Sequence, residues 1–234
     1  MRRFRRAAAL LITLLLAQAA VAHSSGAQTV APAAPKPALA EPWAAELAQF
    51  AAADRVQPPV PGGVLFVGSS SIRMWSTLGA DFPGVRTINR GFGGSELGDV
   101  VRLADRVVVP YRPRLIVLYA GDNDLAAGKT PAQVFGAFRQ FMDVVHRSLP
   151  GTPVAFVAIK PSLAREALLP QIRETNRSVA EYARGDSTVR YVDVYTPMLD
   201  STGRPRAELF QPDGLHMTPT GYALWRGLLT PVVH

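Results

Sequence analysis

Short apolar runs alternate with longer helical patterns along most of the chain. The runs are too short for helices and favour buried strands, whereas Val134, Phe138 and Phe141 recur at the spacing of an amphipathic helix. The predicted strands are Val64–Val67, Val85–Ile88, Leu115–Tyr119, Val154–Ile159 and Val189–Val194, and the predicted helices are Trp43–Ala53, Leu97–Val109, Pro131–Leu149, Arg165–Arg184 and Thr218–Leu229. This alternation predicts a three-layer α/β/α sandwich around a flavodoxin-like, doubly wound parallel sheet of about five strands.

The first 22 residues have the pattern of a signal peptide. Four arginines between Arg2 and Arg6 precede an apolar stretch from Ala7 to Ala17, and Ala20-Val21-Ala22 supplies small residues for cleavage. A retained membrane anchor is the alternative, but the stretch is shorter than the roughly 20 residues that span a bilayer. We therefore expect residues 1–22 to be removed and the protein to be exported to the periplasm or the medium, with no stable membrane insertion afterwards.

Residues 23–42 consist mainly of small residues and proline, which predicts a flexible linker. Residues 43–234 are then expected to form a single domain.

The chain has 25 Lys+Arg and 18 Asp+Glu; without the four leader arginines the difference is 21 − 18, or +3. We expect no nucleic-acid partner, because no basic run remains. The chain has no cysteine, which excludes disulfides and a cysteine nucleophile.

The first predicted strand, Val64–Val67, is followed directly by Gly68, Ser69, Ser70 and Ser71. In open α/β folds the carboxyl edge of the sheet carries the chemistry, so one of these serines is a candidate nucleophile. The alternative is that a serine only caps the helix that follows, since serine is a common N-cap.

One histidine has a sequence context that suggests catalysis. His216 follows Asp213 by three residues in a turn-rich segment, so the carboxylate can accept from Nδ1 and leave Nε2 free to act as a base. The alternative is ordinary turn and capping chemistry. His23 lies at the cleavage site and His234 at the chain end, and we expect His146 on its helix to be a surface or packing residue.

Two more polar loops follow predicted strands. Asn89 to Ser95 contains three glycines, which let the backbone turn amide groups toward a ligand, and Gly121 to Asp124 is a tight polar loop. If the strands are parallel, both loops meet the serine loop, where a glycine N–H and the side-chain amide of Asn123 are candidate donors to a developing oxyanion. Each loop alone is also explained by turn formation.

Four blocks together resemble the GDSL-like, or SGNH, hydrolases, and most closely the branch similar to platelet-activating-factor acetylhydrolase catalytic subunits. They are Phe66-Val67-Gly68-Ser69-Ser70, Gly91-Phe92-Gly93-Gly94, Gly121-Asp122-Asn123-Asp124 and Asp213-Gly214-Leu215-His216. The resemblance implies that Ser70 is the nucleophile and that Asp213 and His216 complete the triad. It also implies an oxyanion hole of Ser70, Gly94 and Asn123. Ser69 stands where the family usually has an acidic residue, and Arg73, Trp75 and Asp124 are expected to be structural.

The resemblance implies a serine esterase that works through an acyl-enzyme, and the leader pattern adds export. The loops between the four blocks are short and contain no long apolar insertion that could cover a fatty chain, so we expect small or short-acyl esters, including acetyl groups on carbohydrate. The alternatives are a lysophospholipase or thioesterase of the envelope, a flavodoxin-like cofactor binder and a non-catalytic carbohydrate-binding module. No cofactor or metal is expected, because no cluster of His, Asp and Glu has ligand spacing. The expected partner is a small-molecule ester, and the sequence does not predict the oligomeric state.

Overall fold

The computed structural model describes residues 42–234, and its centre is a sheet of five parallel strands. The order across the sheet is β2-β1-β3-β4-β5, with every neighbouring pair parallel. The strands are β1 (Val64–Gly68), β2 (Thr87–Gly91), β3 (Leu115–Tyr119), β4 (Val154–Val157) and β5 (Val189–Val192). The predicted parallel sheet is confirmed.

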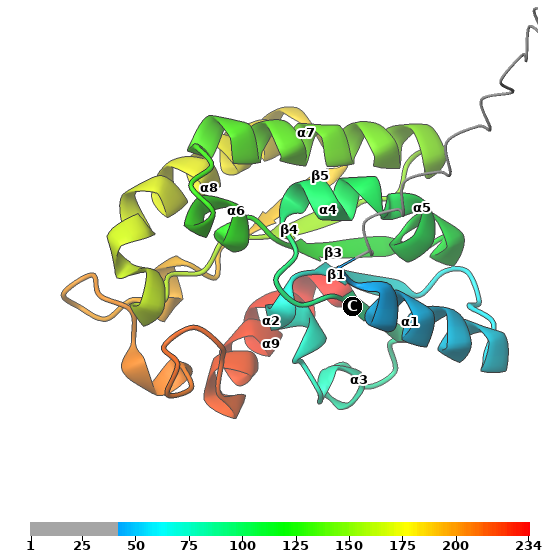
Figure 1. Cartoon of the computed structure of the whole chain (residues 1–234), viewed down its shortest axis with the longest axis horizontal. Coiled ribbons are helices and arrows are strands. Elements are labelled where there is room, and N and C mark those ends of the chain that lie inside the picture. The colour runs from blue at the N-terminus through cyan, green and yellow to red at the C-terminus, as the bar shows by residue number, and fades with distance from the viewer. Residues whose placement is uncertain (1–41) are drawn as a thin grey trace, which may run out of the picture. The chain divides into compact units, whose positions relative to one another are not determined.

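Helices cover both faces of this sheet (Figure 1). One face carries α4 (Leu97–Arg102), α5 (Ala104–Val107), α7 (Pro131–Ser148) and α8 (Leu169–Gly185). The other carries α2 (Ser70–Arg73), α3 (Leu78–Asp81) and α9 (Pro219–Val233). A further helix, α1 (Ala44–Val56), is tied to β2 by a salt bridge between Asp54 and Arg90. The predicted three-layer sandwich is confirmed.

Several predicted elements have different bounds in the structure, and two of these differences lie beside the segments that follow β1 and β2. The second strand was expected over Val85–Ile88 but runs over Thr87–Gly91, so Asn89 belongs to a strand and not to a loop. β2 is an edge strand that pairs with β1 alone, so it is partly exposed and can carry polar residues that an apolar pattern does not reveal. The helix expected over Leu97–Val109 is divided between α4 and α5, and a 3₁₀ turn at Val109–Tyr111 follows.

The parallel arrangement brings the carboxyl ends of the strands to one edge. β1 and β3 are buried along their whole length and are paired in register from Val64 with Leu115 to Gly68 with Tyr119. The segments that follow them therefore start at the same level. α2 begins two residues after β1 ends and α6 (Asp122–Ala126) begins three residues after β3 ends, so both place their first residues at this edge.

The predictions of a signal peptide over residues 1–22 and of a linker over residues 23–42 fall almost entirely outside the described residues. Within residues 42–234, none of the helices combines the length and the apolar character that crossing a membrane requires.

Candidate active site

Ser70 is the first residue of α2 and lies two residues after the buried end of β1. Its two neighbours differ from it in exposure. Ser69 is 0% exposed and Ser71 is 2% exposed, and neither hydroxyl has a hydrogen-bond partner among the described residues. Ser70 is partly exposed, and its Oγ lies 3.0 Å from Nε2 of His216. Of the three serines, only Ser70 is presented to a base in the described part of the chain.

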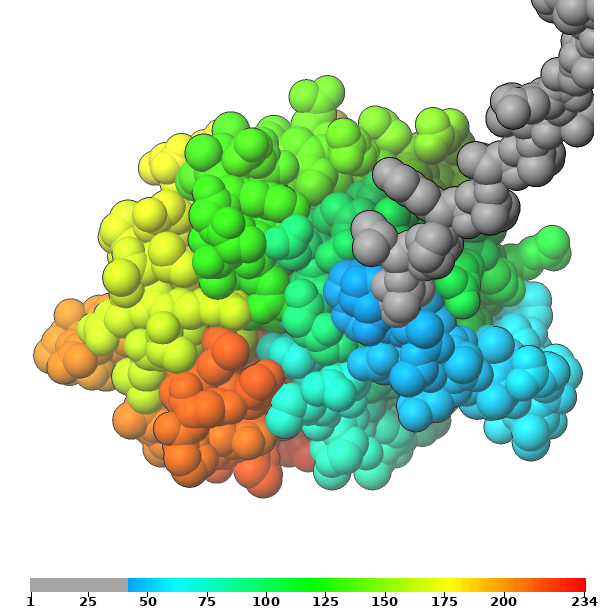
Figure 2. All heavy atoms as spheres, in the orientation of Figure 1, coloured from blue at the N-terminus to red at the C-terminus, as the bar shows by residue number. Residues whose placement is uncertain are grey.

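His216 and Asp213 lie in the segment between β5 and α9, which comes to the surface beside the segment containing α2 (Figure 2). Nδ1 of His216 lies 2.6 Å from Oδ2 of Asp213. The other carboxylate oxygen of Asp213 accepts from the backbone N–H groups of Leu215 and His216, both at 2.9 Å. The carboxylate is therefore fixed by three donors, and the imidazole links it to Ser70.

The electrostatics of Asp213 follow from these contacts. The hydrogen bond from His216, with the two backbone N–H groups, lowers the pKa of Asp213 to about 2. The carboxylate is consequently charged at neutral pH and favours a proton on Nδ1 of the imidazole. In that tautomer Nε2 accepts the hydrogen of the Ser70 hydroxyl.

The glycine loop after β2 lies beside α2. Phe92 donates its backbone N–H to the carbonyl of Gly68, which places the loop at the end of β1. Gly94 has φ +72°, a backbone conformation that L side chains rarely adopt, and no atom lies within 4 Å of where a Cβ would be. The amides of Gly94 and Ser70 donate to no acceptor among the described residues. Both amides are thus available to a ligand.

Asn123 is the second residue of α6, and its side-chain amide is held at both ends. Nδ2 donates to the carbonyl of Ser95 over 2.9 Å, which ties Asn123 to the glycine loop. Oδ1 accepts from the guanidinium of Arg165 over 2.7 Å. The NH₂ group of Asn123 has two N–H donors, and the Ser95 carbonyl accepts from one of them. The other N–H remains for a ligand.

A buried cluster of charges lies behind Asn123. Lys160 is 1% exposed, and its Nζ lies 3.2 Å from Oδ2 of Asp122 and 3.1 Å from the hydroxyl of Tyr119. Nη1 of Arg165 lies 3.0 Å from the same oxygen of Asp122. Burial alone would raise the pKa of Asp122, but the charges of Lys160 and Arg165 override it and lower the pKa.

Reasoning from the sequence missed Lys160 and Arg165. Lys160 directly follows the apolar run Val154–Ile159, so it stands at the carboxyl end of a predicted strand, and this was the available signal. Arg165 carries no such signal, because it lies in a 3₁₀ segment (Leu163–Leu168) that only the fold brings to Asn123.

Two of the residues expected to be structural, Trp75 and Asp124, are buried in the fold, whereas Arg73 is not. Trp75 is 1% exposed and donates its indole N–H to Asp81. Asp124 is fully buried and accepts from the backbone N–H of Leu97, at the start of α4. Arg73 is exposed, with its guanidinium beside Gly93. His146 lies on α7 and contacts Thr188 over 3.2 Å.

The fold and the site together have the form of a serine hydrolase on an α/β/α sandwich. Solved structures with the same architecture include a candidate platelet activating factor from Streptococcus pneumonia, with TM-score 0.73 and 20% identity, covering 81% of this chain and 92% of that one. A GDSL-like lipase from Bacteroides thetaiotaomicron has TM-score 0.69 and 20% identity, with coverage of 80% and 96%. A lipase/acylhydrolase from Enterococcus faecalis has TM-score 0.57 and 21% identity, with coverage of 74% and 95%. At these identities the likeness shows the fold.

The family follows from the sequence match. The model of the GDSL-like lipase/acylhydrolase family matches residues 63–224, and the chain belongs to this family. It is an ester-hydrolysing serine hydrolase, as the resemblance of the four blocks implied. No curated protein sequence matches the chain significantly.

Proposed function

We propose that this enzyme hydrolyses small or short-acyl esters through an acyl-enzyme formed on Ser70. The observation that carries the proposal is the chain of contacts from Ser70 to His216 at 3.0 Å and from His216 to Asp213 at 2.6 Å. His216 takes the proton of the hydroxyl as Ser70 attacks the ester carbonyl and returns it to the leaving alcohol. Asp213 keeps the imidazole in its tautomer and stabilises the imidazolium.

The oxyanion of the tetrahedral intermediate would be held by the N–H groups of Ser70 and Gly94 and by the Asn123 amide. Three features support this assignment. The two backbone amides have no acceptor among the described residues, and the amide of Asn123 has a free N–H and is fixed by the Ser95 carbonyl and by Arg165. Donors that are fixed before the reaction stabilise developing charge without reorganising. Water then hydrolyses the acyl-enzyme with His216 as the base.

An open site supports the preference for short acyl groups. The side chain of Asp213 is 47% exposed and that of His216 is 24% exposed, so the triad borders solvent. The long connection between β5 and α9 is rich in polar residues around Asp200 to Arg206 and offers no apolar lid for a fatty chain. Acetyl esters, including those on carbohydrate, fit such a site. A lysophospholipase or thioesterase of the envelope remains the second candidate.

The N-terminal pattern supports export to the periplasm or the medium. The arginines, the apolar stretch and the small residues before His23 have the order of a cleaved leader. N-terminal sequencing of the mature protein tests this: a start near residue 23 is expected, and recovery of Met1 in a cytoplasmic fraction would contradict it.

The activity is tested by hydrolysis of p-nitrophenyl esters of increasing chain length. Rates should be highest with acetate or butyrate and fall for long chains, and Ser70→Ala should abolish hydrolysis at every length without altering the circular dichroism spectrum. Ser69→Ala and Ser71→Ala are matched controls that remove buried hydroxyls and should keep turnover. A maximum at long chains would contradict the short-acyl proposal while leaving the mechanism in place.

A further inference from the structure

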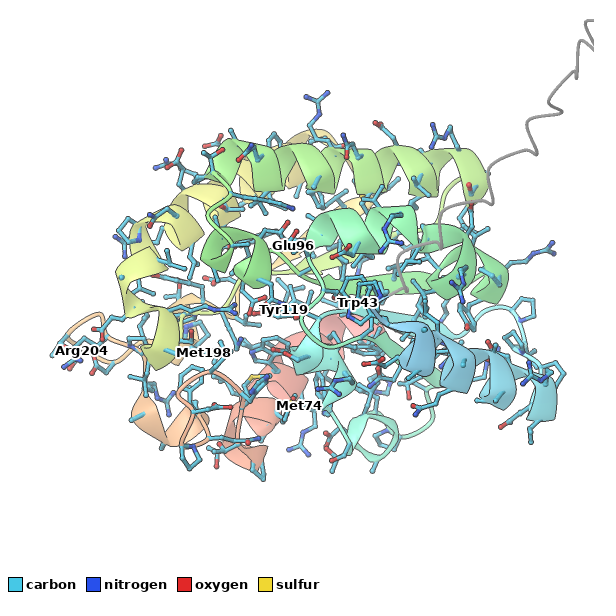
Figure 3. The ribbon with its side chains drawn as sticks, in the orientation of Figure 1. Trp43, Met74, Glu96, Tyr119, Met198 and Arg204 are labelled. Atoms are coloured by element: carbon cyan, nitrogen blue, oxygen red, sulfur yellow. The ribbon has the colours of Figure 1, made fainter. Side chains whose placement is uncertain are left out.

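The peptide between Gly93 and Gly94 is held by a residue far away in the sequence. The indole Nε1–H of Trp43, the residue before α1, donates to the carbonyl oxygen of Gly93 over 2.7 Å. Figure 3 shows Trp43 where the start of α1 meets the region before α4. The family model begins at residue 63, so Trp43 and α1 lie outside the matched domain.

The geometry of a peptide bond connects this contact to the candidate oxyanion hole. The carbonyl of Gly93 and the N–H of Gly94 belong to one planar peptide, and no peptide bond in the described part of the chain is cis. In a trans peptide the C=O and the N–H point in opposite directions. Fixing the oxygen from one side therefore fixes the direction of the N–H on the other, and a hydrogen bond to the oxygen also polarises the N–H.

Among the described residues, the indole of Trp43 is the hydrogen-bond partner of the Gly93–Gly94 peptide. Gly93 and Gly94 have no side chains, and glycine loses more conformational freedom on ordering than any other residue. Gly94 has open space where a Cβ would be, so no packing around that atom holds its φ of +72°. Trp43 is itself fixed by two contacts of its ring. The ring packs edge-on against Phe92, with 5.2 Å between the two ring centroids, and the guanidinium carbon of Arg102 lies 5.8 Å from the centroid of the Trp43 ring.

We infer that Trp43 is a positioning residue for catalysis: α1 orients the Gly94 N–H toward the oxyanion through the Trp43–Gly93 hydrogen bond. The inference rests on the proposed function, in which Gly94 is an oxyanion donor. It assigns α1 a role in turnover in addition to packing. Asn123 is held in the same manner, because Arg165 donates to its carbonyl oxygen over 2.7 Å.

Trp43→Phe tests the inference, because it removes the indole N–H and keeps an aromatic ring against Phe92. Removing a whole oxyanion donor costs on the order of 100-fold to 1000-fold in turnover, and loss of orientation alone should lower kcat about 10-fold with KM unchanged. The inhibition constant of a boronic acid, whose tetrahedral adduct places an oxygen in the oxyanion hole, should rise by the same factor. Benzothienylalanine at position 43 keeps the bicyclic ring, loses only the N–H and should reproduce both effects.

Asp54→Ala is the matched control on the same helix. Asp54 joins the other end of α1 to the body of the protein through Arg90 and Tyr111, so its loss loosens α1 without touching Gly93. This variant should lower the melting temperature and keep kcat and the boronic acid affinity. Equal losses of kcat in Asp54→Ala and Trp43→Phe would mean that α1 acts only through stability and would overturn the inference.

Ser70→Ala, measured in parallel, separates the inference from the function on which it rests. If Ser70→Ala is inactive while Trp43→Phe keeps the kcat and the boronic acid affinity of the unaltered enzyme, the positioning role is wrong and the proposed mechanism stands. If Ser70→Ala remains active, the proposed mechanism itself is wrong and the inference falls with it.

Discussion

The guanidinium of Arg165 donates a hydrogen bond to Oδ1 of Asn123 over 2.7 Å. The same guanidinium lies 3.0 Å from the carboxylate of the buried Asp122, so its position is set by a charge that cannot move to solvent. A charged donor on the carbonyl end of an amide orients the NH₂ end and strengthens its donation. Arg165 thereby connects the buried charges to the candidate oxyanion hole.

Arg165→Met should lower kcat about 10-fold with little change in KM, since losing the donor altogether costs about 100-fold to 1000-fold. A double-mutant cycle with Asn123→Ala measures the coupling: in the Asn123→Ala background, Arg165→Met should cost almost nothing. Arg204→Met is the control, because Arg204 pairs with Glu166 at the exposed margin of the molecule (Figure 3). If Arg165→Met lowers kcat as much in the Asn123→Ala background as in the unaltered enzyme, Arg165 acts elsewhere.

The pKa of Asp213 determines how kcat/KM is expected to change at acid pH. Its pKa of about 2 means that the carboxylate stays charged down to low pH. Any stability that this charge confers is present above the unfolded pKa of about 3.9 and is lost as the pH falls through about 2. Since the mechanism uses a single base and Asp213 stays charged, a fall in kcat/KM between pH 4 and 7 should not include a proton on Asp213. A plot of log kcat/KM against pH should have a limiting slope of 1, and a slope of 2 would contradict this account.

Asp213→Asn should lower kcat on the order of 100-fold to 10,000-fold, because the amide favours the wrong imidazole tautomer. The backbone N–H groups of Leu215 and His216 keep an acceptor in this variant, so the loop should remain folded. Circular dichroism checks the fold and steady-state kinetics checks the rate. Turnover close to that of the unaltered enzyme would remove Asp213 from the mechanism.

Lys160 and Asp122 provide a test of stability. Asp122→Ala leaves the ammonium of Lys160 buried with Arg165 as a like-charged neighbour, which should cost about 3–5 kcal/mol in the free energy of unfolding. Lys160→Met in the Asp122→Ala background removes that buried charge and should recover a large part of the loss. Urea denaturation measures both variants, and equal stability of the single and double variants would contradict the account.

Gly68 is a position at which the fold requires a glycine. Its φ is +134°, and a Cβ would lie 1.8 Å from the carbonyl oxygen of Tyr119 on the neighbouring strand. Gly68→Ala should therefore destabilise the protein by at least about 3 kcal/mol, since both the backbone angle and the close approach exclude a side chain. Gly128→Ala is the control, because its φ is +87° and no atom lies within 4 Å. Equal unfolding free energies for the two variants would show that the clash at Gly68 is relieved.

Local patterns were sufficient to predict the central part of the fold. β1 and β3 are buried on both faces, so their apolar runs alone indicate their positions. β2 was misplaced because an edge strand carries Asn89 and Arg90, which have the character of a loop in sequence. The division between α4 and α5 at Leu103 depends on tertiary packing and has no clear signal in the helical pattern.

The candidate site was predictable where its residues follow strands or neighbour each other in sequence. Ser70, Asn123 and the Asp213–His216 pair have such local signals. Trp43 and Arg165 do not, because each contacts the site through one long-range hydrogen bond, to Gly93 and to Asn123. Such contacts depend on the packing of α1 and of the 3₁₀ segment against the sheet edge, which no local pattern specifies.

Mapping a fluorophosphonate label tests the central claim most directly. The reagent phosphonylates an activated serine, and only Ser70 has its hydroxyl 3.0 Å from an imidazole within the part of the chain that the structure describes. Peptide mass spectrometry should find one label, on Ser70, and no label in the Ser70→Ala or His216→Ala variants. A label on Ser69 or Ser71, or labelling that persists in His216→Ala, would contradict the mechanism.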